Sequence, residues 1–290
     1  MNSAPRQPDL YAVLGNPVEH SRSPRIHQLF AEQCGQTIRY ERRRVEPGAF
    51  AATLAALRAE GARGCNVTVP CKFDAARAAQ RLSERAALAS AANTLGWDDA
   101  GVLWGDNTDG IGLLRDLARL LDAPADTALH ARPVLLLGAG GAAAGVLGAL
   151  VQAGAPSVAV WNRSTDRAAA LVAAHLALAQ RHGCALAAVA QPIAGAALVI
   201  NATASSLGGD ALQLPAGVLG PGVLAYDLMY AAAPTVFVAQ ASAAGARAAD
   251  GLGMLVEQAA ESFALWRGVR PRTAPVLAQL DAELRGRPMP

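Results

Sequence analysis

The chain has 290 residues, which is enough for two domains of ordinary size. With 52% hydrophobic and 17% charged residues, it has the composition of a globular protein and not of a disordered one. A formal net charge of +2 gives no global electrostatic reason to expect nucleic acid or an anionic membrane as a partner.

Short segments that could indicate other classes of protein have ordinary explanations. Residues 1–8 are polar and lack the apolar segment of a secretory signal, so a cytoplasmic location is expected. The uncharged segment 133–161 is long enough for a bilayer span, but its glycines favour a buried strand, a turn and a buried helix. The run Arg42-Arg43-Arg44 is expected to be a solvated strand end and not a binding patch. The four cysteines, Cys34, Cys65, Cys71 and Cys184, form no CxxC pair, so reduced thiols and no metal site are expected.

The first third of the chain alternates between predicted strands and helices. Strands are predicted over 10–14 and 65–69, and helices between Ser23 and Gly35 and over 50–57. Ser23 is expected to be the N-cap of the first helix, with Pro24 at its first helical position. This alternation predicts an α/β domain.

A second α/β pattern follows a predicted helix over 111–121. Strands are predicted over 134–137, 158–161, 185–189, 198–201 and 224–227, with a helix over 142–153. Apolar runs of this kind, separated by helices, are typical of a parallel, doubly wound sheet. A last helix is predicted over 253–266, with an apolar stripe of Leu255, Ala259, Phe263 and Trp266.

A glycine-rich loop, Gly138-Ala139-Gly140-Gly141-Ala142-Ala143, lies directly between a predicted strand and a predicted helix. Glycines in this position permit a tight turn and the close approach of the backbone to a pyrophosphate, which then faces the N-terminus of the helix. The alternative is a turn whose glycines serve only strand–helix packing. The context favours a dinucleotide site.

The end of the next strand, Asn162-Arg163-Ser164, indicates which dinucleotide is bound. NAD sites usually place Asp or Glu there to bind the ribose 2′-hydroxyl, whereas this chain has no acid before Asp166, beyond the turn. Arg163, helped by Arg167, suits a 2′-phosphate through charge-assisted hydrogen bonds. The alternative is that both arginines are ordinary surface charges.

Polar clusters interrupt the apolar background of the chain in a specific order. The first four are Ser21-Arg22-Ser23-Pro24, Asn66-Val67-Thr68-Val69-Pro70-Cys71-Lys72, Ala92-Asn93-Thr94 and Gly105-Asp106-Asn107-Thr108-Asp109-Gly110. After the glycine-rich loop and Asn162-Arg163-Ser164 come Asn201-Ala202-Thr203, Asp227-Leu228-Met229-Tyr230 and Gly253-Met254-Leu255-Val256-Glu257-Gln258. In this order the clusters resemble the shikimate dehydrogenase family over residues 11–284.

The resemblance implies a fold and a domain organisation. It implies an α/β substrate domain from residues 1–108 and 252–290, in which the C-terminal helix returns to the first domain. Residues 109–251 would form a Rossmann-type, doubly wound NADP-binding domain. The substrate, 3-dehydroshikimate or shikimate, would lie in the cleft between the domains of a monomer or homodimer.

The resemblance also implies the substrate and catalytic residues. Lys72 and Asp109 would form the catalytic pair, since the cofactor moves a hydride and the protein handles only a proton. Hydroxyl and amide groups would bind the carboxylate and the ring hydroxyls. The substrate-binding set implied is Ser21, Ser23, Thr68, Lys72, Asn93, Asp109, Tyr230 and Gln258. Taken alone, Lys72 could be a surface lysine, Asp109 a helix cap, and Gln258 an exposed residue beside Glu257 and Glu261.

The cofactor-binding set implied by the resemblance extends beyond the glycine-rich loop. It consists of Glu84, Gly138, Ala139, Gly140, Gly141, Ala142, Asn162, Arg163, Ser164, Arg167, Thr203, Leu228 and Gly251. Two positions depart from the family pattern: Ala144 replaces a common arginine near the phosphates, and Cys71 replaces a larger residue beside Lys72.

Two other functions compete with an NADP-dependent shikimate dehydrogenase of aromatic amino-acid and chorismate biosynthesis. A quinate/shikimate dehydrogenase using NAD or NADP would share the fold and the Lys72/Asp109 pair, but Arg163 favours the NADP enzyme. A non-catalytic dinucleotide-binding module would keep the glycine-rich loop and lose the substrate residues, whereas Lys72, Asp109 and Gln258 are all present.

Overall fold

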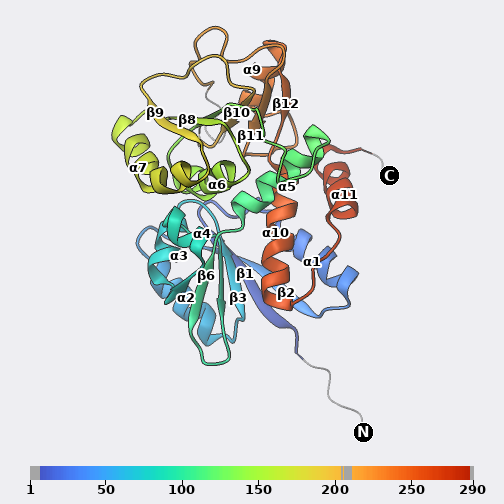
Figure 1. Cartoon of the computed structure of the whole chain (residues 1–290). Coiled ribbons are helices and arrows are strands. Elements are labelled where there is room, and N and C mark those ends of the chain that lie inside the picture. The colour runs from blue at the N-terminus through green and yellow to red at the C-terminus, as the bar shows by residue number, and fades with distance from the viewer. Residues whose placement is uncertain (1–6, 204, 206–210, 288–290) are drawn as a thin grey trace. The chain divides into compact units, whose positions relative to one another are not determined.

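The computed structural model describes residues 7–203, 205 and 211–287 (Figure 1). The chain divides into two compact units, residues 1–108 with 258–276, and residues 109–257 with 277–290. No helix in the described part of the chain has the length and apolar character needed to cross a membrane.

The first unit is built on a six-stranded mixed sheet in the order β2-β1-β3-β5-β6-β4. Its strands are β1 (Asp9–Gly15), β2 (Ile38–Arg44), β3 (Gly64–Val67), β4 (Arg81–Leu82), β5 (Thr94–Trp97) and β6 (Leu103–Asp106). β1 pairs in parallel with β2 and β3, whereas β5 runs antiparallel to both β3 and β6. The strands predicted at 10–14 and 65–69 are confirmed, although β3 ends at Val67. The β5–β6 hairpin was not predicted.

The described helices that lie wholly within the first unit are α1 (Ser23–Cys34), α2 (Phe50–Ala59), α3 (Lys72–Ala78) and α4 (Glu84–Ala89). The prediction that Ser23 is the N-cap of α1 is wrong, because Ser23 is already helical and the cap position is Arg22. Ser21 provides the local hydrogen bond instead, since its Oγ accepts from the Ser23 N–H at 3.3 Å. Gly35 ends the helix as predicted, with a left-handed φ of 62°.

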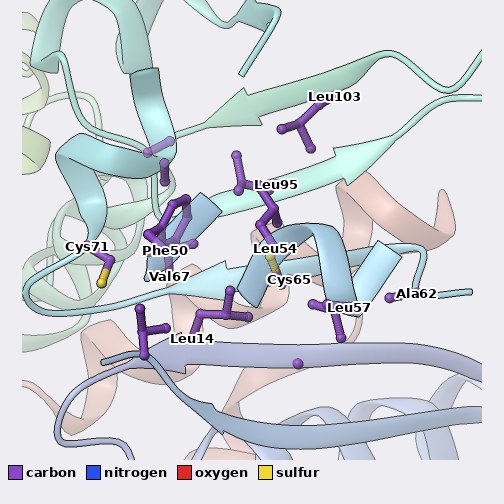
Figure 2. Close-up of a cluster of buried hydrophobic side chains, with 14 of the residues drawn as sticks. Leu14, Phe50, Leu54, Leu57, Ala62, Cys65, Val67, Cys71, Leu95 and Leu103 are labelled. Atoms are coloured by element: carbon purple, nitrogen blue, oxygen red, sulfur yellow. The ribbon is translucent and has the colours of Figure 1, made fainter. Parts of the chain in front are cut away.

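One face of α2 packs on this sheet and forms the core of the first unit (Figure 2). Phe50, Leu54 and Leu57 recur at helical spacing and meet Cys65 and Leu95 from the strands. Burial raises the pKa of the Cys65 thiol, which is fully buried. Cys65 therefore acts as a small apolar side chain and not as a reactive thiol.

The run of arginines at the end of β2 is balanced by its neighbours. Arg42 donates to the Ser21 carbonyl oxygen from Nε at 3.0 Å and from Nη2 at 2.6 Å. Arg43 pairs with Glu41 and Glu60, and Arg44 pairs with Glu19 and Glu46. This confirms a solvated strand end, because each guanidinium already has an acceptor.

The second unit has a six-stranded parallel sheet in the order β12-β11-β10-β7-β8-β9. Its strands are β7 (Val134–Leu137), β8 (Ser157–Trp161), β9 (Ala185–Val189), β10 (Leu198–Asn201), β11 (Leu224–Asp227) and β12 (Arg247–Ala249). The predicted doubly wound sheet is confirmed. Its strand order reverses at β7, which lies between β10 and β8, and such switch points are where parallel α/β sheets bind ligands.

The remaining helices are α5 (Asp109–Leu121), α6 (Gly141–Gln152), α7 (Thr165–Arg181), α9 (Val236–Ala243), α10 (Leu252–Arg267) and α11 (Thr273–Arg285). One boundary between the two units lies directly before α5, and the other two fall inside α10 and α11. The helices predicted at 111–121, 142–153 and 253–266 are confirmed to within a few residues, whereas α11 was not predicted.

Candidate functional site

A buried network of polar side chains gathers at one end of the sheet in the first unit. Asn93 precedes β5 and Thr108 follows β6, and the antiparallel register of this hairpin brings the two positions together. Asn93 Nδ2 donates to Thr108 Oγ1 at 2.9 Å and to Gln258 Oε1 at 3.1 Å. The Thr108 N–H donates to Asn93 Oδ1 at 2.9 Å. These bonds fix the orientation of the Asn93 amide.

Gln258 belongs to this network. Its side chain extends from α10, is 8% exposed, and accepts from both Asn93 and Thr108. The alternative of an exposed polar residue is therefore wrong. Ser262, one turn further along α10, donates to the Gln258 carbonyl oxygen at 3.1 Å and was not predicted as part of the site. Its spacing of four residues from Gln258 places both on one helix face.

Ser21 and Ser23 lie together at the start of α1. Ser21 Oγ donates to Ser23 Oγ at 3.2 Å, and Tyr40 on the neighbouring β2 is hydrogen-bonded to Ser23. Hydroxyl groups near the first turn of a helix can bind a carboxylate. The structure thus brings the two predicted serines together, and their contact with a substrate stays a prediction.

A tight turn after β3 carries Thr68 and Lys72. The Thr68 N–H donates to the Leu14 carbonyl oxygen at 2.8 Å, and the Thr68 carbonyl accepts from the Cys71 N–H at 2.9 Å. Lys72 is the first residue of α3, and its carbonyl accepts from the Ala92 N–H at 2.9 Å. The lysine is therefore held in the first unit, beside the loop that carries Asn93.

The other member of the predicted catalytic pair begins the second unit. Asp109 is the first residue of α5 and is 4% exposed. Because Lys72 and Asp109 belong to different units, their pairing stays a prediction.

The two departures from the family pattern both lie in packed positions. Cys71 precedes α3, is 3% exposed and belongs to the hydrophobic core beneath the turn (Figure 2). Burial raises the pKa of its thiol. Ala144 is a buried residue of α6, 4% exposed. A side chain as long as arginine at position 144 would have to leave this packed helix face.

The glycine-rich loop has the geometry of a dinucleotide site. Gly138 adopts a φ of 113°, and a Cβ there would lie 3.0 Å from the carbonyl carbon and oxygen of Ala202. Gly140 precedes the first residue of α6 with no side-chain cap, and a Cβ there would meet no atom within 4 Å. The space over this helix N-terminus is open, and no acid lies in the first turn. These features fit a pyrophosphate, with Ala139, Gly141 and Ala142 completing the loop.

The residues after β8 present positive charge to solvent. Arg163 and Arg167 are exposed, and neither has an ion-pair partner among the residues that the structure describes. Asn162 Nδ2 donates to the Ser164 carbonyl oxygen at 2.9 Å, which shapes the turn between them. This set of donors can bind a phosphate dianion.

Two buried polar side chains connect the remaining cofactor residues. Asn201, at the end of β10, accepts from the N–H and hydroxyl of Thr203 at 3.1 and 2.7 Å. Asn201 Nδ2 donates to Asp227 Oδ1 at 3.2 Å, and its carbonyl accepts from the Leu228 N–H at 2.9 Å. Asp227 also accepts from Thr235 Oγ1 at 2.6 Å. The loops that carry Thr203 and Leu228 are therefore joined, although neither Asn201 nor Asp227 was predicted as a site residue.

Gly251 completes this region of the second unit. Its N–H donates to the Met229 carbonyl oxygen at 2.9 Å, and a Cβ at this position would lie 2.3 Å from the Leu228 carbonyl oxygen. The backbone of the loop that carries Leu228 and Met229 is thus in direct contact with that of Gly251.

Gly251→Ala is expected to displace the Leu228 loop. The free energy of unfolding should fall by about 1–3 kcal/mol, as for other overpacked positions, and the KM for NADP should rise. Gly220→Ala is the matched control, since a Cβ there would have its nearest neighbour at 3.9 Å. Urea denaturation and steady-state kinetics on both variants check this, and equal stability of the two would contradict the contact.

Two further predicted residues occupy less enclosed positions. Tyr230 follows β11 and is partly buried in the second unit. Glu84 is an exposed residue that begins α4 in the first unit. Their contacts with substrate and cofactor stay predictions. Within the described ranges, no cluster of three or more His, Cys, Asp or Glu side chains could hold a metal ion.

Three family models match the chain in sequence. A shikimate dehydrogenase substrate binding domain matches residues 13–95, a shikimate / quinate 5-dehydrogenase matches residues 122–208, and a shikimate 5′-dehydrogenase C-terminal domain matches residues 251–280. The matches fall in the order of the polar clusters along the chain.

Relatives and solved structures extend this similarity to nearly the whole chain. Shikimate dehydrogenase (NADP(+)) of Acidovorax sp. (strain JS42) is 53% identical over 278 residues, covering 95% of this chain and 97% of its own. The Thermus thermophilus shikimate 5-dehydrogenase in complex with NADP(H) and shikimate is 35% identical, with a TM-score of 0.77 and coverage of 92% and 96%. The quinate dehydrogenase of Corynebacterium glutamicum in complex with NAD is 26% identical, with a TM-score of 0.80 and coverage of 94% and 99%.

Proposed function

The chain belongs to the shikimate dehydrogenase family, and on that premise we propose how its residues carry out the reversible, NADPH-dependent reduction of 3-dehydroshikimate to shikimate. It is an oxidoreductase that acts on a CH–OH group, with NADP as its cofactor and a role in aromatic biosynthesis. The observation that carries this function is the similarity to the Acidovorax shikimate dehydrogenase (NADP(+)), which is 53% identical over 95% of this chain.

The second unit would bind the dinucleotide. The open N-terminus of α6 and the loop at Gly138–Ala142 would hold the pyrophosphate by backbone N–H groups. Thr203, Leu228 and Gly251 would contact the rest of the cofactor from the joined loops. Glu84 of the first unit is proposed as a further cofactor contact. When bound, NADPH supplies the hydride, so the protein has only to bind, orient and move a proton.

The choice of NADP over NAD is proposed to depend on the turn after β8. Arg163 and Arg167 would bind the 2′-phosphate, with Asn162 and Ser164 shaping the turn around it. A guanidinium binds a phosphate by paired, charge-assisted hydrogen bonds. An NAD-specific site would instead need an acid that accepts from the ribose hydroxyl.

The first unit would bind the ring. Ser21 and Ser23 would donate to the substrate carboxylate from the start of α1. Thr68, Asn93 and Gln258, with Tyr230 from the second unit, would bind the ring hydroxyls. The orientation of the Asn93 and Gln258 amides is set by their mutual hydrogen bond before any substrate arrives, and such preorganisation lowers the cost of binding.

Lys72 and Asp109 would handle the proton. In the reductive direction, the Lys72 ammonium would deliver a proton from Nζ to the ketone oxygen as the hydride reaches the carbon. Asp109 would accept a hydrogen bond from the hydroxyl group that forms at this oxygen. In the oxidative direction the same groups would remove the proton.

A second candidate function has support from one similarity. The Corynebacterium quinate dehydrogenase shares the fold, and one matched model covers both substrates. An assay at the absorbance of NADPH, with shikimate and quinate each tested against NADP and NAD, separates the two. Turnover of shikimate with NADP well above the other three combinations is expected. A preference for quinate and NAD would favour the second candidate, and binding of cofactor without turnover would favour a non-catalytic module.

Gln258→Ala is expected to weaken both the site and the fold. It would remove a substrate contact and leave the Asn93 and Thr108 donors without the Oε1 acceptor. The kcat/KM for shikimate should fall by a factor that corresponds to about 1–3 kcal/mol of transition-state stabilisation. The melting temperature should also fall, because the two donors lose their acceptor. Gln279→Ala on α11, where the amide donates to the exposed Glu283 at 2.9 Å, is the control. Unchanged kcat/KM in Gln258→Ala would remove this residue from the substrate set.

A further inference from the structure

We propose that His27 is a positioning residue for substrate binding, which acts through Asn66 to orient the amides of Asn93 and Gln258. This role rests on the proposed function, because Asn93 and Gln258 are the substrate residues it would serve. His27 itself lies in α1, on the opposite side of Asn66 from those amides in the hydrogen-bond network.

The imidazole of His27 is enclosed by aromatic rings in the first unit. It is 0% exposed and stacks on Tyr40 with ring centroids 4.3 Å apart and an interplanar angle of 7°. Phe263 and Trp266 from α10 lie at centroid distances of 6.1 and 5.4 Å. Burial lowers the pKa of His27 to about 3, so the ring is neutral near pH 7.

The hydrogen bonds define which atoms carry protons. Asn66 Nδ2 donates at 3.2 Å to the carbonyl oxygen of Asn93, which can only accept. Asn66 Oδ1 therefore faces the other way and accepts from Tyr40 OH at 2.7 Å and from His27 Nε2 at 3.2 Å. In the neutral ring the proton is then on Nε2, and Nδ1 keeps a lone pair.

This arrangement has a cost that an apolar ring would avoid. Nδ1 of His27 is buried and has no hydrogen-bond partner in the part of the chain that the structure describes. A buried unpaired acceptor destabilises the fold, whereas phenylalanine would suit the aromatic surroundings. What the imidazole offers in exchange is the hydrogen bond to Asn66.

Asn66 is linked to the substrate amides through the Thr94 hydroxyl group. Its Nδ2 lies 3.0 Å from Ser262 Oγ and 3.3 Å from Thr94 Oγ1. Thr94 Oγ1 donates to Asn93 Oδ1 at 2.9 Å, and Asn93 Nδ2 donates in turn to Gln258 Oε1 at 3.1 Å. If the Asn66 amide were inverted, its Oδ1 would face the Asn93 carbonyl oxygen, and the two acceptors would repel each other. The donors Tyr40 OH and His27 Nε2 hold Oδ1 on the other side and so prevent this inversion.

The test compares three histidine variants in the full chain. His27→Phe keeps the stacking and removes the donor, and His27→Gln keeps an N–H at a similar reach. His175→Phe is the matched control, because His175 on α7 is also buried and neutral with an unpaired Nε2. The measurements are the Kd for shikimate by calorimetry, the KM and kcat for shikimate, the KM for NADP and the melting temperature.

His27→Phe is expected to raise the Kd and KM for shikimate about tenfold, the equivalent of one hydrogen bond. Its kcat and its KM for NADP should change much less, and His27→Gln should recover most of the loss. His175→Phe should change no shikimate constant. A purely structural His27 would lower the melting temperature and leave the Kd of the folded fraction unchanged, and that result overturns the proposal.

Three further outcomes also decide the question. Equal losses in His27→Phe and His27→Gln would assign the effect to ring shape and overturn the role of the hydrogen bond. If His27→Phe does not fold, His27→Leu replaces it, since it also removes the donor to Asn66 Oδ1 and keeps an apolar side chain: a raised Kd supports the proposal and an unchanged Kd overturns it. No turnover of shikimate by the unaltered chain would overturn the proposed function itself, and this role with it.

Discussion

Lys72→Ala is expected to lower kcat by about 10²–10⁴-fold, the usual contribution of a general acid or base. The ammonium is the proposed proton donor, and the turn at Thr68–Cys71 contains no other lysine, arginine or histidine. Binding of NADP should stay close to that of the unaltered enzyme, because Lys72 belongs to the first unit and the glycine-rich loop to the second. Single-turnover kinetics and NADP titration by fluorescence measure the two effects separately.

The matched control for Lys72→Ala lies on the same helix. Arg77→Ala removes an exposed cation of α3 that pairs with Asp74, and exposed ion pairs contribute little to stability. It should therefore leave kcat unchanged. A fall of less than about tenfold in Lys72→Ala would leave no room for general acid–base catalysis by this residue.

Arg163→Ala is expected to raise the KM for NADP strongly while changing the use of NAD little. The lost interaction is with the 2′-phosphate only, and a hydrogen bond to a charged group contributes roughly 1.5–3 kcal/mol. The fold should be unaffected because Arg163 is exposed and follows β8 in a turn. Steady-state kinetics with both cofactors at saturating shikimate measure the change in preference.

The control for Arg163→Ala is Arg181→Ala. Arg181 is an exposed arginine in the last turn of α7, far along the helix from the turn after β8. Arg181→Ala removes one positive charge from the second unit, as Arg163→Ala does, so any effect of net charge on NADP binding appears in both variants. Equal losses with NADP and NAD in Arg163→Ala would mean that the side chain supports the turn instead of selecting the phosphate.

Five of the six strands of the second unit could be predicted from sequence, together with α5 and α6, whereas α7, α9 and β12 were not predicted. β7 and β10 are uninterrupted apolar runs because a parallel sheet covered on both faces buries every side chain of its central strands. The glycines that follow β7 then mark the turn into α6. In such a sheet the local pattern and the final environment agree, and short-range information is sufficient.

The β5–β6 hairpin was missed because glycine weakens the strand signal. Gly96 and Gly105 each lie inside a four-residue strand, where glycine is usually unfavourable. The structure compensates by pairing Gly96 with Trp104 across the hairpin, so that the indole covers the space above the glycine. This compensation is visible only once the two strands are paired.

α11 was missed for a different reason. Pro275 normally ends a helical pattern, but here it lies in the first turn, where its missing N–H has no helical partner to lose. The apolar face of α11 is also short, with Val276 and Leu280 one turn apart. A proline near the start of the segment and a narrow apolar face together gave a sequence pattern that is typical of a loop.

The polar site could be predicted only as separate clusters. Asn93 and Gln258 are hydrogen-bonded although 165 residues separate them, and Asn66 and Ser262 are 196 residues apart. No periodicity encodes such contacts. The burial of Gln258 could not be predicted from its neighbours in sequence, since it depends on Asn93 and Thr108, which flank β5 and β6.

Gly138 and Gly140 of the glycine-rich loop differ in what a mutation would endanger. A side chain at Gly138 meets the backbone of Ala202 and requires a left-handed φ, so most substitutions there would be removed by misfolding before activity mattered. At Gly140 the φ of −91° suits any residue and a Cβ finds open space, so a substitution would be tolerated by the fold and would compete with the cofactor alone. A descendant that lost its activity could accordingly change at Gly140 and persist as a folded, inactive protein. Gly138 would be retained in active and inactive descendants alike, because the fold itself requires it.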